Sequence, residues 1–160
     1  MQKVNGSYGQ WKWGRGDGMA DTTNALLKRI VGSKDFQKVL EENGDAFEER
    51  SISEYLRRLC EEQGIVPEQV IKKAQIDRTY GHQLFNGTRN PSRDKLIQLS
   101  RGFELSLEET QTLLKKAGKS MLYPKIKRDA ACIYGISHGM NVMELQELLL
   151  SVDVPLLDKC

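Results

Sequence analysis

The hydrophobic positions along the chain recur mainly at helical spacing. Leu26, Leu27, Ile30 and Val31 lie three or four positions apart, and a Gly-Ser pair separates them from a second short apolar group. Almost no segment alternates apolar and polar residues with a period of two, so strands are not expected. The pattern therefore predicts an all-α fold.

Four further helices are predicted between residues 51 and 103, because turn and cap residues punctuate the apolar spacing there. Proline suits the first turn of a helix, where its missing N–H costs nothing, and aspartate caps a helix by accepting from its free amides. The third of these helices is predicted to run from Arg78 to Asn86, with Leu84 and Phe85 buried. The punctuating residues are Ser53, Gly64, Pro67, Asp77, Gly87 and the pair Pro91-Ser92.

The C-terminal third of the chain repeats itself at an offset of 35 residues, so that residues 94–122 align with residues 129–157. Each copy predicts a helix, a capped turn and a second helix, and hairpins of this kind stack because neither can bury its apolar face alone. A duplicated helical hairpin is the interpretation, and chance similarity between amphipathic helices is the alternative. The aligned pairs include Leu105 with Met140, Ser106 with Asn141, Glu109 with Glu144, Gln111 with Gln146 and Leu114 with Leu149.

Composition describes an ordinary soluble protein of 160 residues, with 39% hydrophobic and 29% charged residues. No apolar run approaches the roughly 20 residues that cross a bilayer, and the N-terminus has no apolar core of a secretory signal. Cys60, Cys132 and Cys160 are widely spaced and odd in number, which favours a reducing, cytoplasmic location over a zinc site or a disulfide scaffold. We expect no membrane association, no metal and no cofactor, and we expect Cys60 and Cys132 in the core.

Charge is distributed unevenly, although the formal net charge is only +2. Residues 41–62 hold eight acids and three bases, a net of −5, whereas residues 72–101 hold seven bases and two acids, a net of +5. A basic stripe of this kind indicates either a polyanion-binding face or a solvated surface. Its bases are Lys72, Lys73, Arg78, Arg89, Arg93, Lys95 and Arg101.

The segment PEQVIKKAQIDRTYGHQLFNGTRNPSRDKLIQLS, residues 67–100, resembles the lambda-repressor-like (Xre) helix-turn-helix family, and the resemblance extends over residues 51–105. The family's apolar contacts correspond to Val70, Ala74, Ile76 and Leu84. The cap of its recognition helix corresponds to Asp77, and NGTRNPSRDKL is similar to its glycine stop, polar loop and next helix start.

Three positions depart from the family pattern. Ile71 replaces a small alanine, Gly81 replaces a branched apolar residue that faces it, and Gln75 replaces the turn glycine. We interpret the first two as an exchange of size that preserves the core volume. A non-glycine residue at the turn predicts a small strain cost.

The resemblance implies sequence-specific binding of double-stranded DNA by a bacterial or phage-type transcriptional regulator, which is not an enzyme. The helix 78–86 would read the major groove. Arginine suits guanine, glutamine and asparagine suit adenine, and threonine suits the thymine methyl. The base contacts expected on that basis are Arg78, Thr79, His82, Gln83 and Asn86. The phosphate contacts expected are Lys73, Tyr80, Thr88, Arg89, Asn90, Ser92 and Arg93.

Alternatives remain for several of these residues. The recognition face is otherwise a solvated helix surface, with Arg93 and Asp94 pairing with neighbours. The basic cluster at 123–128 either extends the phosphate footprint or decorates a helix start. The rival function is a helical protein–protein interaction adaptor that reuses a helix-turn-helix core. An enzyme is not expected, because near-neutral bases and phosphate-cradling loops are too few for catalysis.

The predicted organisation has four parts. A flexible tail rich in glycine and aromatic residues covers 1–19, a helical segment covers 20–50, the helix-turn-helix core covers 51–103, and the hairpins cover 104–160. Leucines crowd the last helix and predict a possible homodimer through the C-terminal hairpins, which would suit paired DNA half-sites. These leucines are Leu145, Leu148, Leu149 and Leu150.

Overall fold

The computed structural model describes residues 17–44 and 51–158 and is all-helical over both ranges, as the periodicity predicts. The chain divides into two compact units, Met1–Glu49 and Arg50–Cys160. The first unit contains α1 (Asp17–Gly32) and α2 (Phe36–Glu42). The second contains α3 (Ile52–Gln63), α4 (Pro67–Lys73), α5 (Arg78–Asn86), α6 (Arg93–Gly102), α7 (Leu107–Lys116), α8 (Lys127–Ser137) and α9 (Val142–Ser151).

The first unit is a pair of helices, of 16 and 7 residues, in which few of the described residues are buried. Asp35 caps α2 by accepting from the Lys38 N–H, and the Arg29 guanidinium donates to Asn43 Oδ1 at 2.8 Å. Val39 is buried. Helix α1 already begins at Asp17, inside the segment predicted as tail, and the aromatic and glycine positions before it lie outside the described residues.

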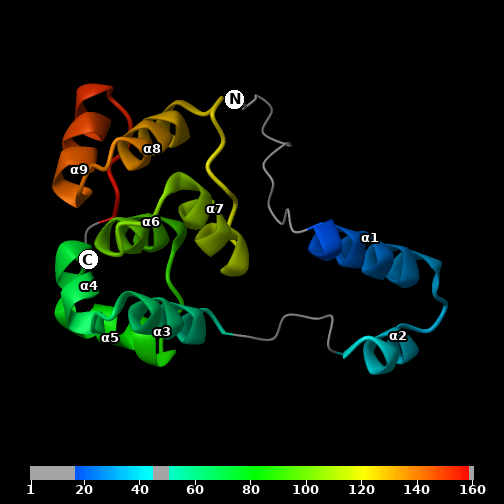
Figure 1. Ribbon diagram of the computed structural model, residues 1–160. Helices are drawn as coiled ribbons and strands as arrows, with labels where there is room; N and C mark the ends of the chain where they lie inside the picture. Colours follow the sequence, from blue (N-terminus) through cyan, green and yellow to red (C-terminus); the bar gives the residue numbers. More distant parts are fainter. Residues whose placement is uncertain (1–16, 45–50, 159–160) are drawn as a thin grey trace. The chain divides into compact units, whose positions relative to one another are not determined.

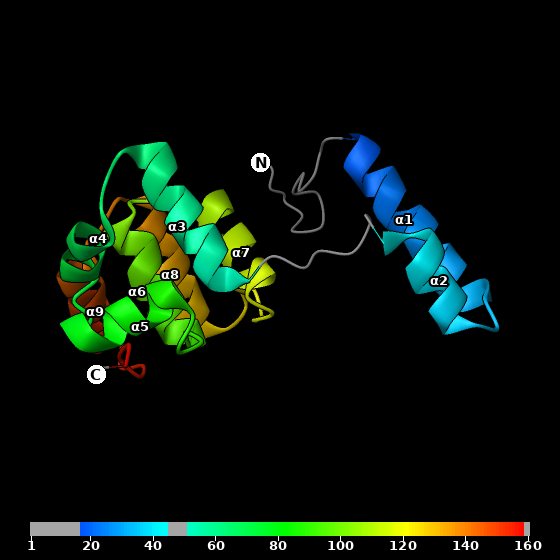
Figure 2. The same ribbon diagram turned by 90° about the horizontal axis from the view of Figure 1, so that it is seen from below.

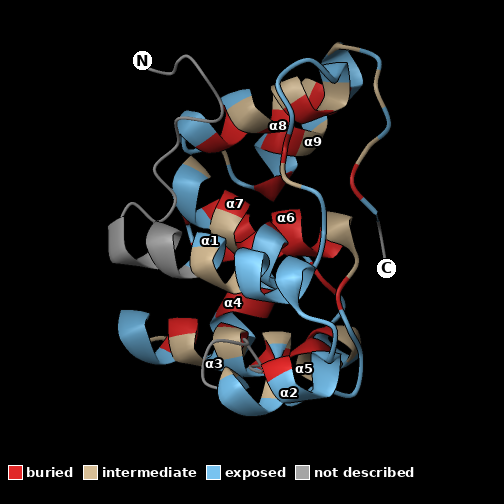
Figure 3. Cartoon of the chain, turned by 90° about the vertical axis from the view of Figure 1, so that its right-hand side faces the viewer, coloured by how far each residue is buried: buried red, intermediate tan, exposed pale blue. Residues whose placement is uncertain are grey.

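The second unit is arranged around α6 (Figures 1 and 2). Helices α3, α4 and α5 lie on one side of α6, and α7, α8 and α9 lie on the other sides. Every residue of α6 from Lys95 to Gly102 is buried, and buried positions gather where α6, α7 and α8 face one another (Figure 3). One helix therefore packs against both halves of the unit.

Local signals account for most helix boundaries. Gly64 ends α3 in the left-handed conformation at φ 68°, Pro67 is the first residue of α4, and Asp77 and Gly87 bracket α5 as predicted. The start of α3 differs slightly, because the hydroxyl of Ser51, and not Ser53, accepts from the Glu54 N–H. Ser53 is buried instead.

The two C-terminal hairpins, α6–α7 and α8–α9, exchange arginine–aspartate pairs. Arg93 on α6 donates bidentately to the Asp129 carboxylate on α8 at 3.1 and 2.9 Å. Arg128 on α8 donates bidentately to the Asp94 carboxylate on α6 at 3.0 and 2.9 Å. Residues 93 and 128, and residues 94 and 129, are each separated by the same 35 positions at which the sequence segments align. We call this pair of contacts the reciprocal exchange.

Other hydrogen bonds recur at the same offset. The Arg93 guanidinium also donates to the carbonyls of Ser120 and Met121, and that of Arg128 donates to those of Pro155 and Leu156. The side chain of Gln111 bonds both backbone groups of Leu122, as Gln146 does with Leu157. Capping boxes form at Ser106–Glu109 and at Asn141–Glu144. The two hairpins are therefore alike in structure as well as in sequence.

The packing of the hairpins removes most of the leucines from the expected dimer surface. Leu145 and Leu149 are buried against the chain's own core, and Leu148 is partly buried. Leu150 is 69% exposed and Met143 is 58% exposed. The leucine-rich pattern of α9 thus reflects contacts within one chain, because this helix packs against both α8 and α6.

Cys60 and Cys132 are free, buried thiols, as expected from the sequence. Desolvation by burial raises the pKa of both thiols, that of Cys132 to about 11. A buried thiol with a raised pKa carries little thiolate at neutral pH, so neither side chain is suited to nucleophilic chemistry.

The reciprocal exchange predicts an acid-sensitive part of the stability. Partial burial acts to raise the pKa of Asp94, but hydrogen bonds and charge from Arg128 outweigh it and hold that pKa below its usual value. The stability that the lowered pKa of Asp94 contributes is fully present above the unfolded-state pKa of about 3.9. It is lost as the pH falls through the lower folded-state pKa. We expect Asp94→Asn to lower the free energy of unfolding by about 1–3 kcal/mol at pH 7, measured by urea denaturation. The deficit should shrink below about pH 4.

Asp153→Asn is the matched control, because Asp153 is exposed, lies outside the exchange and has a φ of 57° that asparagine tolerates. Its effect should be small at every pH. An equal loss in both variants, or a deficit in Asp94→Asn that persists at acid pH, would contradict the assignment.

Candidate nucleic-acid interface

The turn between α4 and α5 is closed by backbone bonds and one buried side chain. The N–H of Ile76 donates to the Ile71 carbonyl at 3.2 Å, and Ile76 itself is buried. Gln75 has a φ of 57°, so the residue predicted to carry strain does adopt the left-handed conformation. The side chain of Gln98, on α6, donates to the Ala74 carbonyl at 3.1 Å and fixes the turn to the central helix.

The exchange of size between Ile71 and Gly81 is confirmed. A Cβ atom placed on Gly81 would lie 2.6–2.9 Å from three side-chain carbons of Ile71, closer than real Cβ atoms approach. Isoleucine therefore fills the space that a branched side chain on α5 would occupy, and this contact sets how closely α5 approaches α4.

The ends of α5 are satisfied by side chains as well. The Asp77 carboxylate accepts from the Tyr80 N–H at 3.0 Å. At the other end, Arg57 on α3 donates to the Phe85 carbonyl at 2.6 Å, and Gly87 continues the chain at φ 87°. With Leu84 and Phe85 buried, α5 is held by its inner face and by both ends.

The five expected base-contact residues lie on α5, and none is fully buried. Arg78, Thr79 and Asn86 are exposed, and His82 and Gln83 are half-buried. The Asn86 side-chain oxygen accepts from the Thr88 N–H at 2.9 Å, and this bond shapes the loop after α5. The side-chain N–H groups of Asn86 are left to donate to another acceptor.

Glu68, on α4, adds a negative charge to this face. Its carboxylate accepts from Arg78 Nε at 2.7 Å and contacts His82 Nε2 at 2.6 Å. These bonds hold the pKa of Glu68 below its usual value, with the bond to His82 the largest cause and that to Arg78 the next. The carboxylate is therefore ionised at neutral pH.

The expected phosphate contacts divide into two groups. Thr88, Arg89 and Asn90 are exposed in the loop after α5, and the Arg89 guanidinium lies 5.1 Å from the centroid of the Tyr80 ring. Lys73 is exposed but forms an ion pair with Glu104 at 2.7 Å. Thr88, Arg89, Asn90 and the half-buried Tyr80 therefore remain available beside α5, whereas Lys73 is exposed with its charge paired.

Arg93 and Ser92 have other roles, and this corrects their expected assignment to phosphate. Four bonds to Asp129, Ser120 and Met121 occupy the Arg93 guanidinium, as described for the reciprocal exchange. The Ser92 hydroxyl caps α6 and donates to Asp158 at 3.3 Å. Such internal bonds satisfy the groups that a phosphate would need, so the alternative of pairing with neighbours is the better description.

The basic stripe is likewise smaller on the surface than in the sequence. Lys95 is 1% exposed, and its ammonium donates to Gln98 Oε1 at 3.0 Å and to the Asp158 carbonyl at 2.8 Å. Arg101 is 5% exposed and donates to the carbonyls of Met140 and Leu105. With Arg93 also bonded internally, the bases of the stripe at the surface are Lys72, Lys73, Arg78 and Arg89.

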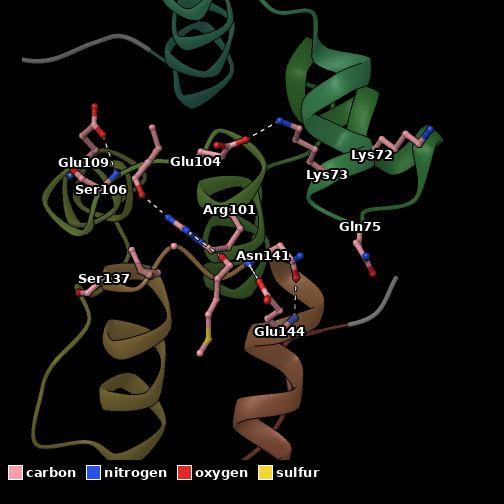
Figure 4. Close-up of a pocket in the computed structure, with 14 residues that line it drawn as sticks. Lys72, Lys73, Gln75, Arg101, Glu104, Ser106, Glu109, Ser137, Asn141 and Glu144 are labelled. Carbon is pink, nitrogen blue, oxygen red and sulfur yellow. Dashed lines mark hydrogen bonds and ion pairs between the residues drawn. The ribbon is translucent and has the colours of Figure 1, made fainter.

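A pocket of about 800 Å³ lies where three turns meet (Figure 4). The end of α4 and the turn after it contribute Lys72, Lys73 and Gln75, and the turns inside the two hairpins with the adjoining helix ends contribute the rest. Its charges are largely committed to the protein, because Lys73 pairs with Glu104 and the two other glutamates accept from the capped helix starts. Arg101 bonds one hairpin turn to the other across this pocket, so we assign it a structural role.

Comparison with protein families identifies a helix-turn-helix domain at residues 51–113. The match begins at the cap of α3 and ends within α7, so it includes one helix more than the core predicted from the sequence. No curated protein and no solved structure matches the chain.

Two further features of the described residues concern metal binding and membrane spans. No group of three or more histidine, cysteine, aspartate or glutamate side chains in residues 17–44 and 51–158 is placed to hold a metal ion. None of the helices there is both long enough and apolar enough to cross a membrane.

Glu68 is the residue of this face that sequence reasoning missed. It lies ten positions before Arg78, and only the crossing of α4 and α5 brings its carboxylate to Arg78 and His82. The spacing of Arg78 and His82, four apart on one helix, is the only signal in the sequence that a single anion bridges them.

The contact between α4 and α5 predicts a non-additive pair of substitutions. Gly81→Val alone should lower the free energy of unfolding by about 1–3 kcal/mol because its side chain overpacks Ile71. Ile71→Ala alone should cost about 2–5 kcal/mol because it leaves a cavity. The double variant Ile71→Ala/Gly81→Val moves the volume to the other helix and should lose clearly less than Ile71→Ala and Gly81→Val lose together. Urea denaturation of the four proteins measures the coupling, and simple additivity would show that the two side chains do not share this space.

Proposed function

We propose that the chain binds double-stranded DNA in a sequence-specific manner and acts as a bacterial or phage-type transcriptional regulator. The helix-turn-helix domain supports DNA binding, and α5 is the helix that would enter the major groove. The observation that carries the proposal is the division of α5 into a packed inner face and an outer face of hydrogen-bonding side chains.

The proposed base contacts are Arg78, Thr79, His82, Gln83 and Asn86, all on the outer face of α5. Gln83 and Asn86 offer the paired donor and acceptor that match adenine, and Thr79 offers a methyl group for thymine. The proposed phosphate contacts are Lys73, Tyr80, Thr88, Arg89 and Asn90. Lys73 ends α4, Tyr80 lies on α5, and the other three lie in the loop after α5. Contacts of this kind beside a recognition helix fix its register.

A protein-interaction adaptor is the second candidate, and one observation favours it. The Glu68 carboxylate offsets part of the positive charge beside α5, and three bases of the stripe are bonded internally. An adaptor would bind a partner protein through the helix-turn-helix core and would show no preference among duplexes. A homodimer, if it forms through the hairpins, would use the exposed Met143 and Leu150 of α9.

Selection from a random duplex library tests the proposal directly. We expect the wild-type chain to enrich one sequence, and Gln83→Ala to lose about tenfold or more of its preference at one position, as expected for a lost bidentate base contact. Gln37→Ala is the matched control, because Gln37 is exposed on α2 in the other unit. It should enrich the same sequence as the wild type.

Salt dependence separates phosphate contacts from base contacts. Arg89→Ala should weaken binding to every duplex by a similar factor and reduce the slope of log K against log salt by about 1. A change of slope in Gln83→Ala instead would argue against its assignment as a base contact. If no duplex binds even at low salt, the adaptor becomes the better function.

A further inference from the structure

The Glu68 carboxylate joins two of the proposed base-contact residues. One of its oxygens accepts from Arg78 Nε at 2.7 Å, and the other contacts His82 Nε2 at 2.6 Å. All three side chains keep contact with solvent, with 76% of the Arg78, 48% of the Glu68 and 41% of the His82 side chain exposed. Two charged groups and a ring are thus held as one cluster at the start of α5.

The bond to Nε leaves the outer end of Arg78 unoccupied. Its two terminal amino groups have no partner among residues 17–44 and 51–158. These groups form the pair of parallel N–H donors that matches O6 and N7 of guanine. A guanidinium held through Nε loses less conformational freedom when it binds a base than one that is free to rotate.

The bond to Nε2 also fixes the tautomer of His82. An ionised carboxylate can only accept, so the hydrogen of the contact must lie on Nε2. In the neutral ring, Nδ1 is then an acceptor.

The cluster also lowers attraction to phosphate. The charge of Glu68 offsets that of Arg78, so this arginine adds little to the electrostatic attraction that every duplex offers. A positioning residue of this kind raises the preference for one sequence without raising the affinity for all sequences.

From this geometry we infer that Glu68 is a positioning residue that sets the base preference at the start of α5 by directing Arg78 to guanine. The inference rests on the proposed function, since it assumes that α5 reads duplex DNA.

The test compares the full-length chain with Glu68→Gln, Glu68→Ala, Arg78→Ala and the double variant Glu68→Ala/Arg78→Ala. Each is measured on the selected duplex, on the same duplex with the guanine assigned to Arg78 replaced, and on an unrelated duplex. Glu147→Gln is the control. Glu147 is an exposed glutamate on α9, far along the chain from α5, and its substitution removes the same charge. Circular dichroism confirms that each variant is folded.

We expect both Glu68 variants to reduce the preference for guanine about tenfold, the effect of loosening one bidentate contact. Affinity for the unrelated duplex should stay the same or increase, because a negative charge has been removed. The double variant should lose no more preference than Arg78→Ala, and Glu147→Gln should behave as the wild type.

The inference is overturned if Arg78→Ala loses the preference for guanine but the Glu68 variants keep it. It is also overturned if the Glu68 variants weaken binding to all three duplexes equally, which would indicate a structural role. A wild-type chain that binds none of the duplexes would overturn the proposed function itself, and this outcome is distinct from the other two.

Discussion

The second unit depends on the burial of α6 from Lys95 to Gly102, because this helix packs against two sets of partners at once. On one side it carries Gly102, where a Cβ atom would lie 2.6 Å from the Val70 carbonyl, so α4 approaches its backbone closely. On the other side Arg93 and Asp94 start the same helix and form both halves of the reciprocal exchange. Partly buried charges of this kind are costly unless they are paired and fully hydrogen-bonded, and here each guanidinium also meets two backbone carbonyls. The helix that packs against α4 and its turn is therefore also the helix that holds the hairpins together.

That double role explains why charge patterning alone overestimated the basic surface beside α5. A net of +5 over residues 72–101 indicates a basic surface only if its members point to solvent. Lys95, Arg93 and Arg101 lie on α6, and a central helix turns every side toward protein. Their long side chains reach carbonyl groups and a carboxylate, and the sequence cannot reveal this because most of those acceptors lie between 27 and 63 positions away. The positive surface that remains exposed is therefore small, and the negative charge of Glu68 offsets part of it.

Local chemistry was a more reliable guide than charge. The bounds of α5, its cap at Asp77, the left-handed Gln75 and the exchange of size between Ile71 and Gly81 all follow from short-range signals or from the family resemblance. The helix-turn-helix domain and the all-α fold were predictable for the same reason. The cluster at Glu68 was not, because it depends on the crossing of two helices. The leucines of α9 were also ambiguous, since burial within one chain and burial in a dimer produce the same pattern.

Because of the reciprocal exchange, the part of the chain that is packed as one unit extends beyond the helix-turn-helix domain at residues 51–113. A fragment that stops at residue 113 would keep Arg93 and Asp94 but lose both of their partners, Asp129 and Arg128. Local unfolding of the last hairpin would therefore loosen the start of α6, and through it the turn that holds α5. Linkage works in both directions, so any ligand that stabilises α5 in its packed position should also make opening of the last hairpin less favourable, although the ligand does not touch that hairpin. The C-terminal residues are in this sense part of the structure that positions α5.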